Sequence, residues 1–329
     1  MVDPDAAEKL GRLVELLERP DGGALEVGYY DKTCPRAEDI VRAQVRKAVG
    51  DNAGVGAGLI RLLFQDCFVE GCDASVLLDP TLENPQPEKL GIPNVGSLRG
   101  FQVIDAAKRA LQEACPGIVS CADIVAFGAR DASYILSVSD YITDFHMPAG
   151  RLHGRYSNAT ETLDFLPSPF GNLSELVTKF AAKGLDEEDL VVLSGANSIG
   201  RAHCSSFADR VGSRSDMDPS FKRWLRRRCQ ADPVDTDSRT VRHDTVTAAV
   251  LDSQYYTNVL RHRVLLTSDA ALLDSRQTAR MVREFASGDG KWESKFETAM
   301  VKMAGTDVKD GTDGEIRKNC RFVNQQRER

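Results

Sequence analysis

Eight cysteines are spread over almost the whole chain, at Cys34, Cys67, Cys72, Cys115, Cys121, Cys204, Cys229 and Cys320. None forms a Cys-x-x-Cys pair, and none stands at zinc-ligand spacing from a pair of histidines. The even number predicts four disulfides and therefore an oxidising compartment, over the alternative of eight buried free thiols in a cytosolic protein. Because eight cysteines allow about 105 pairings, the spacing alone leaves their connectivity open.

Composition excludes several classes of protein. With 42% hydrophobic and 28% charged residues over 329 positions, the chain is too apolar for a disordered protein and has no fibrous bias. The formal net charge of -7 argues against nucleic acid or an anionic membrane surface as the main partner. No stretch approaches the roughly 20 apolar residues of a membrane helix.

The apolar pattern predicts an all-α fold. Helical spacing occurs over 37–50, 101–114, 120–137, 173–183, 186–195, 246–260, 276–287 and 292–303, while alternation typical of strands is scarce. Two Pro-, Gly- and Asn-rich stretches, 79–100 and 147–172, are predicted to be surface loops. Residues 1–28 are predicted to be an N-terminal extension with a short helix ending at Pro20 and without the apolar core of a signal peptide, and 29–329 to be the main domain.

The segment 58–79, GLIRLLFQDCFVEGCDASVLLD, holds the residues best suited to chemistry. Arg61 and Gln65 are four residues apart, so on a helix they share a face, with Phe64 beside them. Five hard oxygen ligands follow within ten residues: the side chains of Asp66, Asp73 and Ser75, and the carbonyls of Val69 and Gly71. This density predicts a Ca²⁺ loop, and the alternative is a helix end followed by an acidic turn.

This segment resembles the distal motif of the plant secretory (class III) haem peroxidases, LRLxFHDCFVxGCDAS. The resemblance extends from Tyr30 to Cys320 through YYDKTCP, RGFQVID, CPGIVSCADI, LSGANSIGRAHCSSF and LDSQYY. It implies helices around a central haem pocket. It also implies the disulfides Cys34–Cys115, Cys67–Cys72, Cys121–Cys320 and Cys204–Cys229.

The resemblance also implies site residues. It places a distal calcium site at Asp66, Val69, Gly71, Asp73 and Ser75, and a proximal one at Ser198, Asp244, Thr247, Val250 and Asp252. Arg61 and Phe64 match catalytic distal positions, and Glu88 and Asn94 match the residues behind the distal one. Pro167 matches the loop where phenolic donors dock, and Asp269 the carboxylate behind the proximal haem ligand.

Two positions depart from the family pattern. Gln65 stands where the family has its distal histidine, and Asn197 stands where it has the proximal one. A glutamine amide binds peroxide but cannot shuttle a proton, which costs about 10²–10⁴ in rate. An asparagine amide is a weak, neutral ligand for iron, and Asp269 is expected to have lost its partner. Both replacements are close to histidine in size, which fits deliberate substitution as well as drift.

No other histidine is expected to replace the missing ligands. His203 is predicted to lie on a different helical face from Asn197, nearly two turns along. The remaining four, His146, His153, His243 and His262, are predicted to be solvated in loops or polar surroundings.

Three functions therefore remain open. The first is a catalytically degenerate member of the family, the second an active secretory peroxidase with non-standard haem ligation, and the third a non-enzymatic, calcium-stabilised binding protein. The resemblance implies haem b, two Ca²⁺, H₂O₂ with small phenolic donors, no nucleic acid or membrane partner, a monomer and an extracellular or vacuolar location. Two sequons, at Asn158 and Asn172, fit secretion.

Overall fold

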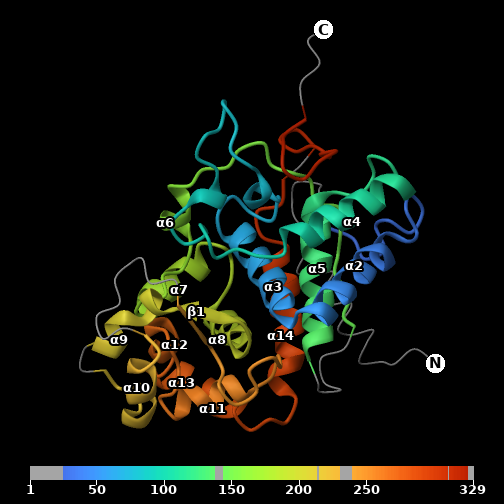
Figure 1. Cartoon of the computed structure of the whole chain (residues 1–329). Coiled ribbons are helices and arrows are strands. Elements are labelled where there is room, and N and C mark those ends of the chain that lie inside the picture. Colours follow the sequence, from blue (N-terminus) through green and yellow to red (C-terminus); the bar gives the residue numbers. More distant parts are fainter. Residues whose placement is uncertain (1–24, 138–143, 213–214, 230–238, 310, 325–329) are drawn as a thin grey trace, which may run out of the picture. The chain divides into compact units, whose positions relative to one another are not determined.

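The computed structural model describes residues 25–137, 144–212, 215–229, 239–309 and 311–324 (Figure 1). These residues form two compact units. The first contains 25–135, 144–166, 297–309 and 311–324, and the second contains 136–137 and the described part of 167–296. The helix predicted before Pro20 lies outside the described residues.

The first unit is built from helices. They are α2 (Ala37–Asp51), α3 (Ala53–Phe68), α4 (Phe101–Ala114), α5 (Cys121–Leu136, its last residue in the second unit), α6 (Glu161–Phe165) and the 3₁₀ turns η1 (Ser75–Leu77) and η2 (Glu88–Leu90). A further helix, α14 (Lys291–Ala304), has residues in both units.

The second unit is also mainly helical. Its helices are α7 (Leu173–Ala181), α8 (Glu187–Ser194), α9 (Ala208–Gly212), α10 (Pro219–Arg226), α11 (Gln254–Leu260), α12 (Thr267–Ala271) and α13 (Arg276–Phe285), with 3₁₀ turns η3 (Gly195–Ser198) and η4 (Cys204–Phe207). Among the described residues, the strands are β1 (Arg201–His203) and β2 (Thr240–Arg242), which pair antiparallel with Ala202 opposite Val241. The all-α prediction is confirmed.

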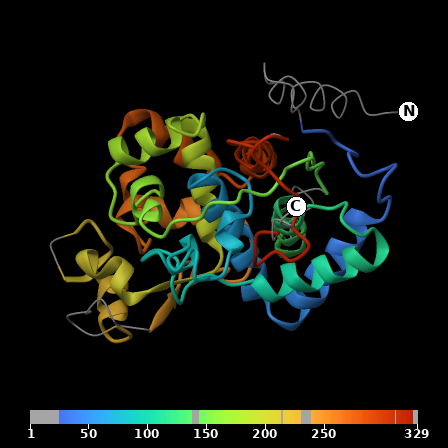
Figure 2. The ribbon, with the colours of Figure 1, turned by 90° about the horizontal axis from the view of Figure 1, so that it is seen from above.

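The core of the first unit lies around α5. A Cβ placed on Gly128, in the middle of this helix, would touch Ile104 of α4, Leu59 of α3 and Val45 of α2, at 3.7, 3.9 and 3.9 Å. Figure 2 shows the same grouping from above, with α5 between its neighbours. Because three helices approach one point, α5 is buried almost all round and reads as a continuous apolar run.

The predicted helical periods are confirmed in the helices that flank α5. In α2 the buried positions Val41, Val45 and Val49 recur every four residues, and α4 buries Ile104 and Leu111 on one face. Most of the charged residues lie on the other faces, although α4 also buries Lys108 beside Ile104 and Leu111, so each helix gains stability by burying one mainly apolar stripe.

The second unit has an aromatic core. The ring of Tyr256 in α11 lies 5.2 Å from that of Phe285 in α13 and 6.0 Å from that of Trp292 in α14. The Tyr256 hydroxyl donates to the Val191 carbonyl at 2.9 Å, and Trp292 Nε1 donates to that of Val192 at 3.0 Å. These bonds satisfy carbonyls near the C-terminal end of α8, from which the following turn starts.

One helix prediction is half wrong. The segment 246–260 is helical only from Gln254 onward. Its first half is a loop because the Asp244 carboxylate accepts the backbone N–H groups of Val246 and Thr247, which offers the chain an alternative to helix. The two predicted loops hold the short helices η2 and α6.

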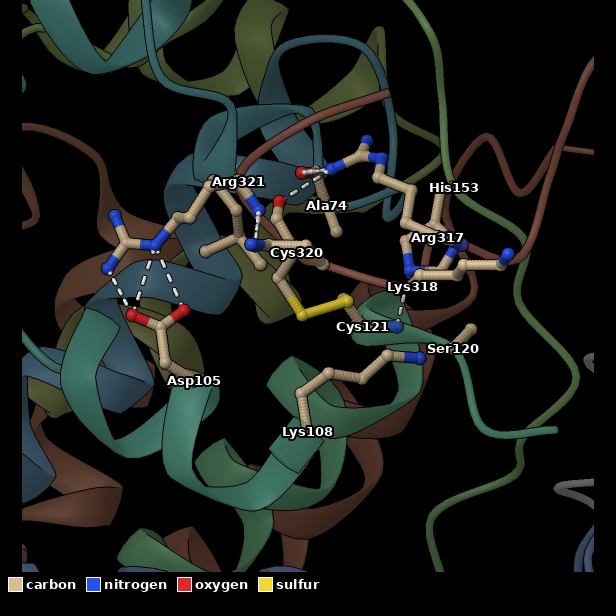
Figure 3. Close-up of a disulfide and its surroundings, with 12 residues drawn as sticks. Ala74, Asp105, Lys108, Ser120, Cys121, His153, Arg317, Lys318, Cys320 and Arg321 are labelled. Atoms are coloured by element: carbon tan, nitrogen blue, oxygen red, sulfur yellow. Dashed lines mark hydrogen bonds and ion pairs between the residues drawn. A yellow bond between two sulfur atoms is a disulfide. The ribbon is translucent and has the colours of Figure 1, made fainter. Parts of the chain in front are cut away.

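The four disulfides pair as the resemblance implies: Cys34–Cys115, Cys67–Cys72, Cys121–Cys320 and Cys204–Cys229. The third joins residues 199 positions apart and ties the C-terminal segment to the start of α5 (Figure 3). Among the described residues no helix combines the length and apolarity needed to cross a membrane.

Candidate functional site

Helix α3 carries the distal residues, as predicted. Arg61 and Gln65 lie one turn apart, and Phe64 stands between them in the sequence. The Phe64 ring is half-buried, with its centroid 4.4 Å from that of Phe68. The helix therefore holds the three distal positions in one rigid element.

Arg61 is anchored to the loop that follows η2. Its Nη2 donates to the Pro93 carbonyl at 2.9 Å and to Ser97 Oγ at 3.2 Å. Burial and the charge of Arg99 lower the pKa of Arg61. Asn94 belongs to the same loop, so these hydrogen bonds connect the Arg61 guanidinium to the segment that carries the Asn94 amide.

Two buried amide oxygens in this half of the site lack a hydrogen-bond donor among the described residues: Gln65 Oε1 and Asn94 Oδ1. Asn94 is fixed by its Nδ2, which donates to the Glu88 carbonyl at 2.9 Å. A buried acceptor without a donor costs about 1–3 kcal/mol. The resemblance places an imidazole N–H donor at position 65, which would be a donor for such an oxygen.

The chain turns sharply after α3 at Gly71. This residue has φ +105, and a Cβ there would lie 2.2 Å from the Asp307 carbonyl oxygen, so only glycine fits. The turn returns the backbone so that Asp66 Oδ2 accepts the Ala74 N–H at 2.9 Å and Asp73 Oδ1 accepts the Ser75 N–H at 2.8 Å. The predicted distal oxygen ligands are thus drawn together, with Val69 buried at the end of the helix.

The loop after α3 and the neighbouring turn η2 bury more oxygen acceptors than the surrounding hydrogen-bond donors can satisfy. Asp73 Oδ2, Ser75 Oγ and Glu88 Oε2 are buried without a hydrogen-bond partner among the described residues, and the side chains are fully buried. Burial, then the charge of Asp73, raises the pKa of Asp66 well above its usual range. Burial, then the charge of Asp66, does the same for Glu88.

Two cations partly compensate this charge. Lys309 Nζ lies 3.5 Å from Asp73 Oδ2. The fully buried Arg317 donates through Nη1 to the carbonyls of Ala74 and Cys320, both at 3.0 Å, and through Nη2 to that of Gly154 at 2.6 Å (Figure 3). Arg317 therefore connects the Cys121–Cys320 segment with the distal loop.

Asn197, at the predicted proximal position, lies in turn η3, and its side-chain amide makes a hydrogen bond. Asn197 Nδ2 donates to Asp269 Oδ1 at 2.9 Å. The same oxygen accepts the Tyr255 hydroxyl at 2.9 Å, and Asp269 Oδ2 accepts the Leu266 N–H at 3.2 Å. The expectation that Asp269 has lost its partner is wrong, because an asparagine amide supplies the N–H that an imidazole would have supplied.

Tyr255 is a site residue that the sequence analysis did not single out. It is 2% exposed, and burial followed by the charge of Asp269 raises its pKa well above the usual value. The hydroxyl therefore stays protonated and acts as a permanent donor to Asp269. The signal for it lay in the LDSQYY motif, but Asp269 is fourteen residues away in the sequence.

The second predicted oxygen cluster also comes together. Thr247 Oγ1 bridges Asp244 Oδ2 at 3.3 Å and Asp252 Oδ1 at 3.1 Å, and Ser198 Oγ accepts the Asp252 N–H at 3.3 Å. Burial raises the pKa of Asp252 to about 6. Val250 lies in the same loop and donates its N–H to the Thr247 carbonyl at 2.8 Å. Unlike the distal loop, this cluster satisfies most of its oxygens internally.

Pro167 is half-buried at the start of the second unit. Its predicted role with phenolic donors rests on the sequence motif.

Two expectations about histidines are wrong. His203 lies in β1 and not on a helix shared with Asn197. His153 is fully buried: its Nε2 accepts the Cys121 N–H at 2.5 Å, and Nδ1 lies 2.6 Å from the Glu315 carbonyl. Burial, then the charge of Arg317, lowers its pKa well below the usual value, so the ring is neutral and structural.

The residues of the chain fit one of the two expected cofactors, calcium, and do not fit the other, haem iron. The distal loop fits a hard divalent cation, because its unpaired oxygens and mutually repelling carboxylates are what such an ion neutralises. Among the described residues, no group of three or more His, Cys, Asp or Glu side chains is placed so that it could hold a metal ion, so this fit depends on hydroxyl and carbonyl oxygens as well as on carboxylates. The position that the resemblance assigns to the haem ligand does not fit an iron that requires imidazole, since residue 197 carries an amide.

Comparison with known proteins supports the resemblance found in the sequence. A family model described as Peroxidase matches residues 41–288. The chain is 58% identical to "Peroxidase 2" of Zea mays over 91% of this chain and 89% of that protein. It is 46% identical to "Peroxidase 1" of Zea mays over 91% and 83%, and 42% identical to "Peroxidase 39" of Arabidopsis thaliana over 91% and 93% of the two chains.

Proposed function

The chain belongs to the class III peroxidase family of plants, and from this premise we propose that it is a catalytically degenerate member. It keeps the disulfide-bonded fold, while the H₂O₂-dependent oxidation of phenolic donors that defines the family is weak or absent. The proposal rests on the chemistry of the two substituted positions.

The hydrogen bond from Asn197 to Asp269 carries the proposal. In this family the carboxylate makes an imidazole ligand more electron-donating, which assists cleavage of the O–O bond. Here the same carboxylate holds a neutral amide, whose other polar atom is a carbonyl oxygen with little donor strength. The site keeps the supporting network and lacks the ligand that this network serves.

The distal half supports the same conclusion. Arg61 remains to polarise a bound peroxide, but Gln65 has no titratable group to take a proton from one peroxide oxygen and deliver it to the other. Such a loss lowers the rate by about 10²–10⁴. To be an efficient peroxidase, a protein with both substitutions would need another group to ligate the iron and another group to transfer the proton.

We further propose that the distal loop holds Ca²⁺ through Asp66, Asp73, Ser75 and the carbonyls of Val69 and Gly71. Asp73 Oδ2 and Ser75 Oγ, which are buried without a hydrogen-bond donor among the described residues, support this assignment. The ion would supply positive charge between buried carboxylates, and so fix the end of α3 and with it Gln65. A second ion at Ser198, Asp244, Thr247, Val250 and Asp252 is proposed on the gathered oxygens alone.

The remaining assignments follow from the family. Disulfides and family membership support an extracellular or vacuolar location and a monomer. If turnover survives, H₂O₂ and small phenols are the substrates, and Pro167 lies in the loop that meets the donors.

Restoring the histidines tests the proposal. Asn197→His should create haem affinity, measured by absorption titration of the disulfide-intact protein with haemin. Adding Gln65→His should restore oxidation of guaiacol by H₂O₂. His203→Gln is the control, since this histidine lies in β1 and should change neither measurement.

Three results would contradict the proposal. If the unmodified chain binds haem and turns over guaiacol, it is an active peroxidase with non-standard ligation. If the double variant regains neither property, the two substitutions do not explain the loss. If the unmodified chain instead binds a small apolar ligand in place of haem, the third function, a binding protein, becomes the better description.

A further inference from the structure

The segment that follows α14 lies against the distal loop. The Cys72 N–H donates to the Thr306 carbonyl at 3.1 Å. The Asp307 carbonyl oxygen takes the space that a Cβ on Gly71 would need. The chain turns at Asp307, whose φ of +46 lies in the left-handed region that aspartate adopts more readily than most residues. Two residues beyond this turn, the side chain of Lys309 contacts the distal loop.

The ammonium group of Lys309 lies between two acidic residues of this loop. Its Nζ donates to the Glu70 carbonyl at 2.9 Å and to Glu70 Oε2 at 3.3 Å, and it lies 3.5 Å from Asp73 Oδ2. The side chain is 23% exposed, so water screens its charge only in part. Burial acts to lower the pKa of Lys309, but the charges of Asp73 and Glu70 outweigh it and raise the pKa. The side chain is therefore a cation at neutral pH.

Asp73 is the carboxylate that Lys309 shares with the proposed calcium ion. Its Oδ1 accepts the Ser75 N–H at 2.8 Å, which fixes the orientation of the group. Its Oδ2 is buried and accepts no hydrogen bond among the described residues, so the ion pair with Lys309 is the electrostatic compensation that it has there. A Cβ on Gly154 would lie 2.0 Å from Oδ2, so the backbone of that glycine closes another side of the oxygen.

We propose that Lys309 is an internal competitor of Ca²⁺ at the distal loop. In the metal-free protein its ammonium group neutralises part of the charge of Asp73 and Glu70, and by the same contacts it lowers the affinity of the loop for the ion. This inference rests on the proposal that the distal loop holds Ca²⁺, and it adds a residue outside the loop that sets how tightly the ion is held.

Two physical effects give the competition its direction. The affinity of a calcium loop rises with the negative charge of its ligands, and Lys309 neutralises part of that charge at Asp73. An ammonium group and a divalent cation beside one carboxylate also repel each other, and partial burial strengthens the repulsion. Lys309 therefore stabilises the loop when calcium is absent and opposes the ion when calcium is present.

Calorimetric titration of the full, disulfide-intact chain with Ca²⁺, after treatment with EDTA and removal of the chelator, tests the proposal. Lys309→Met removes the charge and keeps an unbranched side chain, and it should lower the dissociation constant about tenfold, the size of one partly buried charged contact. Lys309→Arg keeps the charge and should bind like the unmodified chain. Lys47→Met is the matched control, because Lys47 is an exposed lysine of α2 in the same unit. Binding at the second proposed calcium site should be the same in every variant.

The melting temperature separates competition from a purely structural role. In EDTA, Lys309→Met should melt about 3 °C below the unmodified chain, because the loop has lost a counter-charge. In saturating calcium the difference should disappear, because a tenfold gain in affinity offsets it. Lys47→Met should melt like the unmodified chain in both conditions.

The possible results distinguish this inference from the calcium assignment on which it rests. If the unmodified chain binds Ca²⁺ and Lys309→Met binds it equally or more weakly, the competition is refuted and the calcium site stands. If Lys309→Met melts lower by the same amount in EDTA and in calcium, Lys309 is structural and the competition is again refuted. If no variant binds Ca²⁺, the calcium assignment is wrong and the inference falls with it. Binding by Lys309→Met but not by the unmodified chain would support the competition in its strongest form.

Discussion

Lys108 is buried without a carboxylate partner among the described residues. The free energy of unfolding should therefore change with pH in the alkaline range. Its side chain is 4% exposed, and Nζ donates to the Val119 carbonyl at 2.6 Å. Figure 3 shows Lys108 reaching toward Ser120, next to the Cys121–Cys320 disulfide. Burial, with a contribution from the charge of Arg317, lowers its pKa from 10.5 to about 8. The folded protein therefore holds this proton less tightly than the unfolded chain does.

The sign and size of the effect follow from that difference. Between pH 8 and 10.5 the unfolded chain binds more protons at this lysine, so the free energy of unfolding rises with pH. The stabilisation is complete above pH 10.5 and is lost as pH falls through about 8. A shift of about 2.5 units corresponds to about 3 kcal/mol over the full range, and about 2 kcal/mol of it falls between pH 7 and 9.5.

Lys108→Met isolates this contribution. At pH 7 the variant avoids the burial of a charge and leaves the Val119 carbonyl without a donor, which costs about 1 kcal/mol. We expect it to be more stable than the unmodified protein by about 2 kcal/mol at pH 7, and nearly equal to it at pH 9.5. Urea unfolding with the disulfides intact, followed by circular dichroism, measures both differences.

Lys47→Met is the matched control, since Lys47 is an exposed lysine of α2. Its substitution should leave the free energy of unfolding nearly unchanged at both pH values. The reasoning is refuted if Lys108→Met is destabilising at pH 7, or if its difference from the unmodified protein is the same at pH 7 and 9.5.

Three other outcomes are expected. EDTA should lower the melting temperature by about 5 °C or more when calcium is initially present at 100 times its dissociation constant. At that concentration a bound ion stabilises the fold by about 2.7 kcal/mol per site, and an unchanged melting temperature would exclude a bound ion. The intact mass should be eight hydrogens below that of the reduced chain, whereas thiol labelling without reduction would show that a disulfide is missing. In the Asn197→His background, Asp269→Asn should weaken haem binding about 10–100-fold, while Asp269→Asn alone should leave haem binding unchanged; equal effects in both backgrounds would show that Asp269 does not act through position 197.

Much of the fold could be predicted from local sequence. The spacing of Val41, Val45 and Val49 marks a helix because one apolar stripe must face a core. The failure at 246–253 has a local cause as well: Asp244 captures the backbone N–H groups that a helix would use. Helix α10 was not predicted because its eight residues hold only three large apolar side chains, Phe221, Trp224 and Leu225, which are too few to establish a helical period.

The site was less predictable, because its contacts join distant parts of the chain. His153 looked solvated because its partners, Cys121 and Glu315, are 32 and 162 residues away. The sequence predicts that Asp269 loses its partner when position 197 is not histidine, because the sequence does not show where an asparagine amide points. The structure shows that Asn197 donates a hydrogen bond to Asp269, so the local network survives without an imidazole at this position.

The absorption spectrum of the unmodified, disulfide-intact protein after addition of haemin and removal of the excess tests the central claim most directly. If Gln65 and Asn197 have ended the chemistry of the site, the spectrum should be that of free haemin, and adding H₂O₂ should not oxidise guaiacol. A sharp Soret band together with guaiacol turnover would contradict this account and show that another group holds the iron.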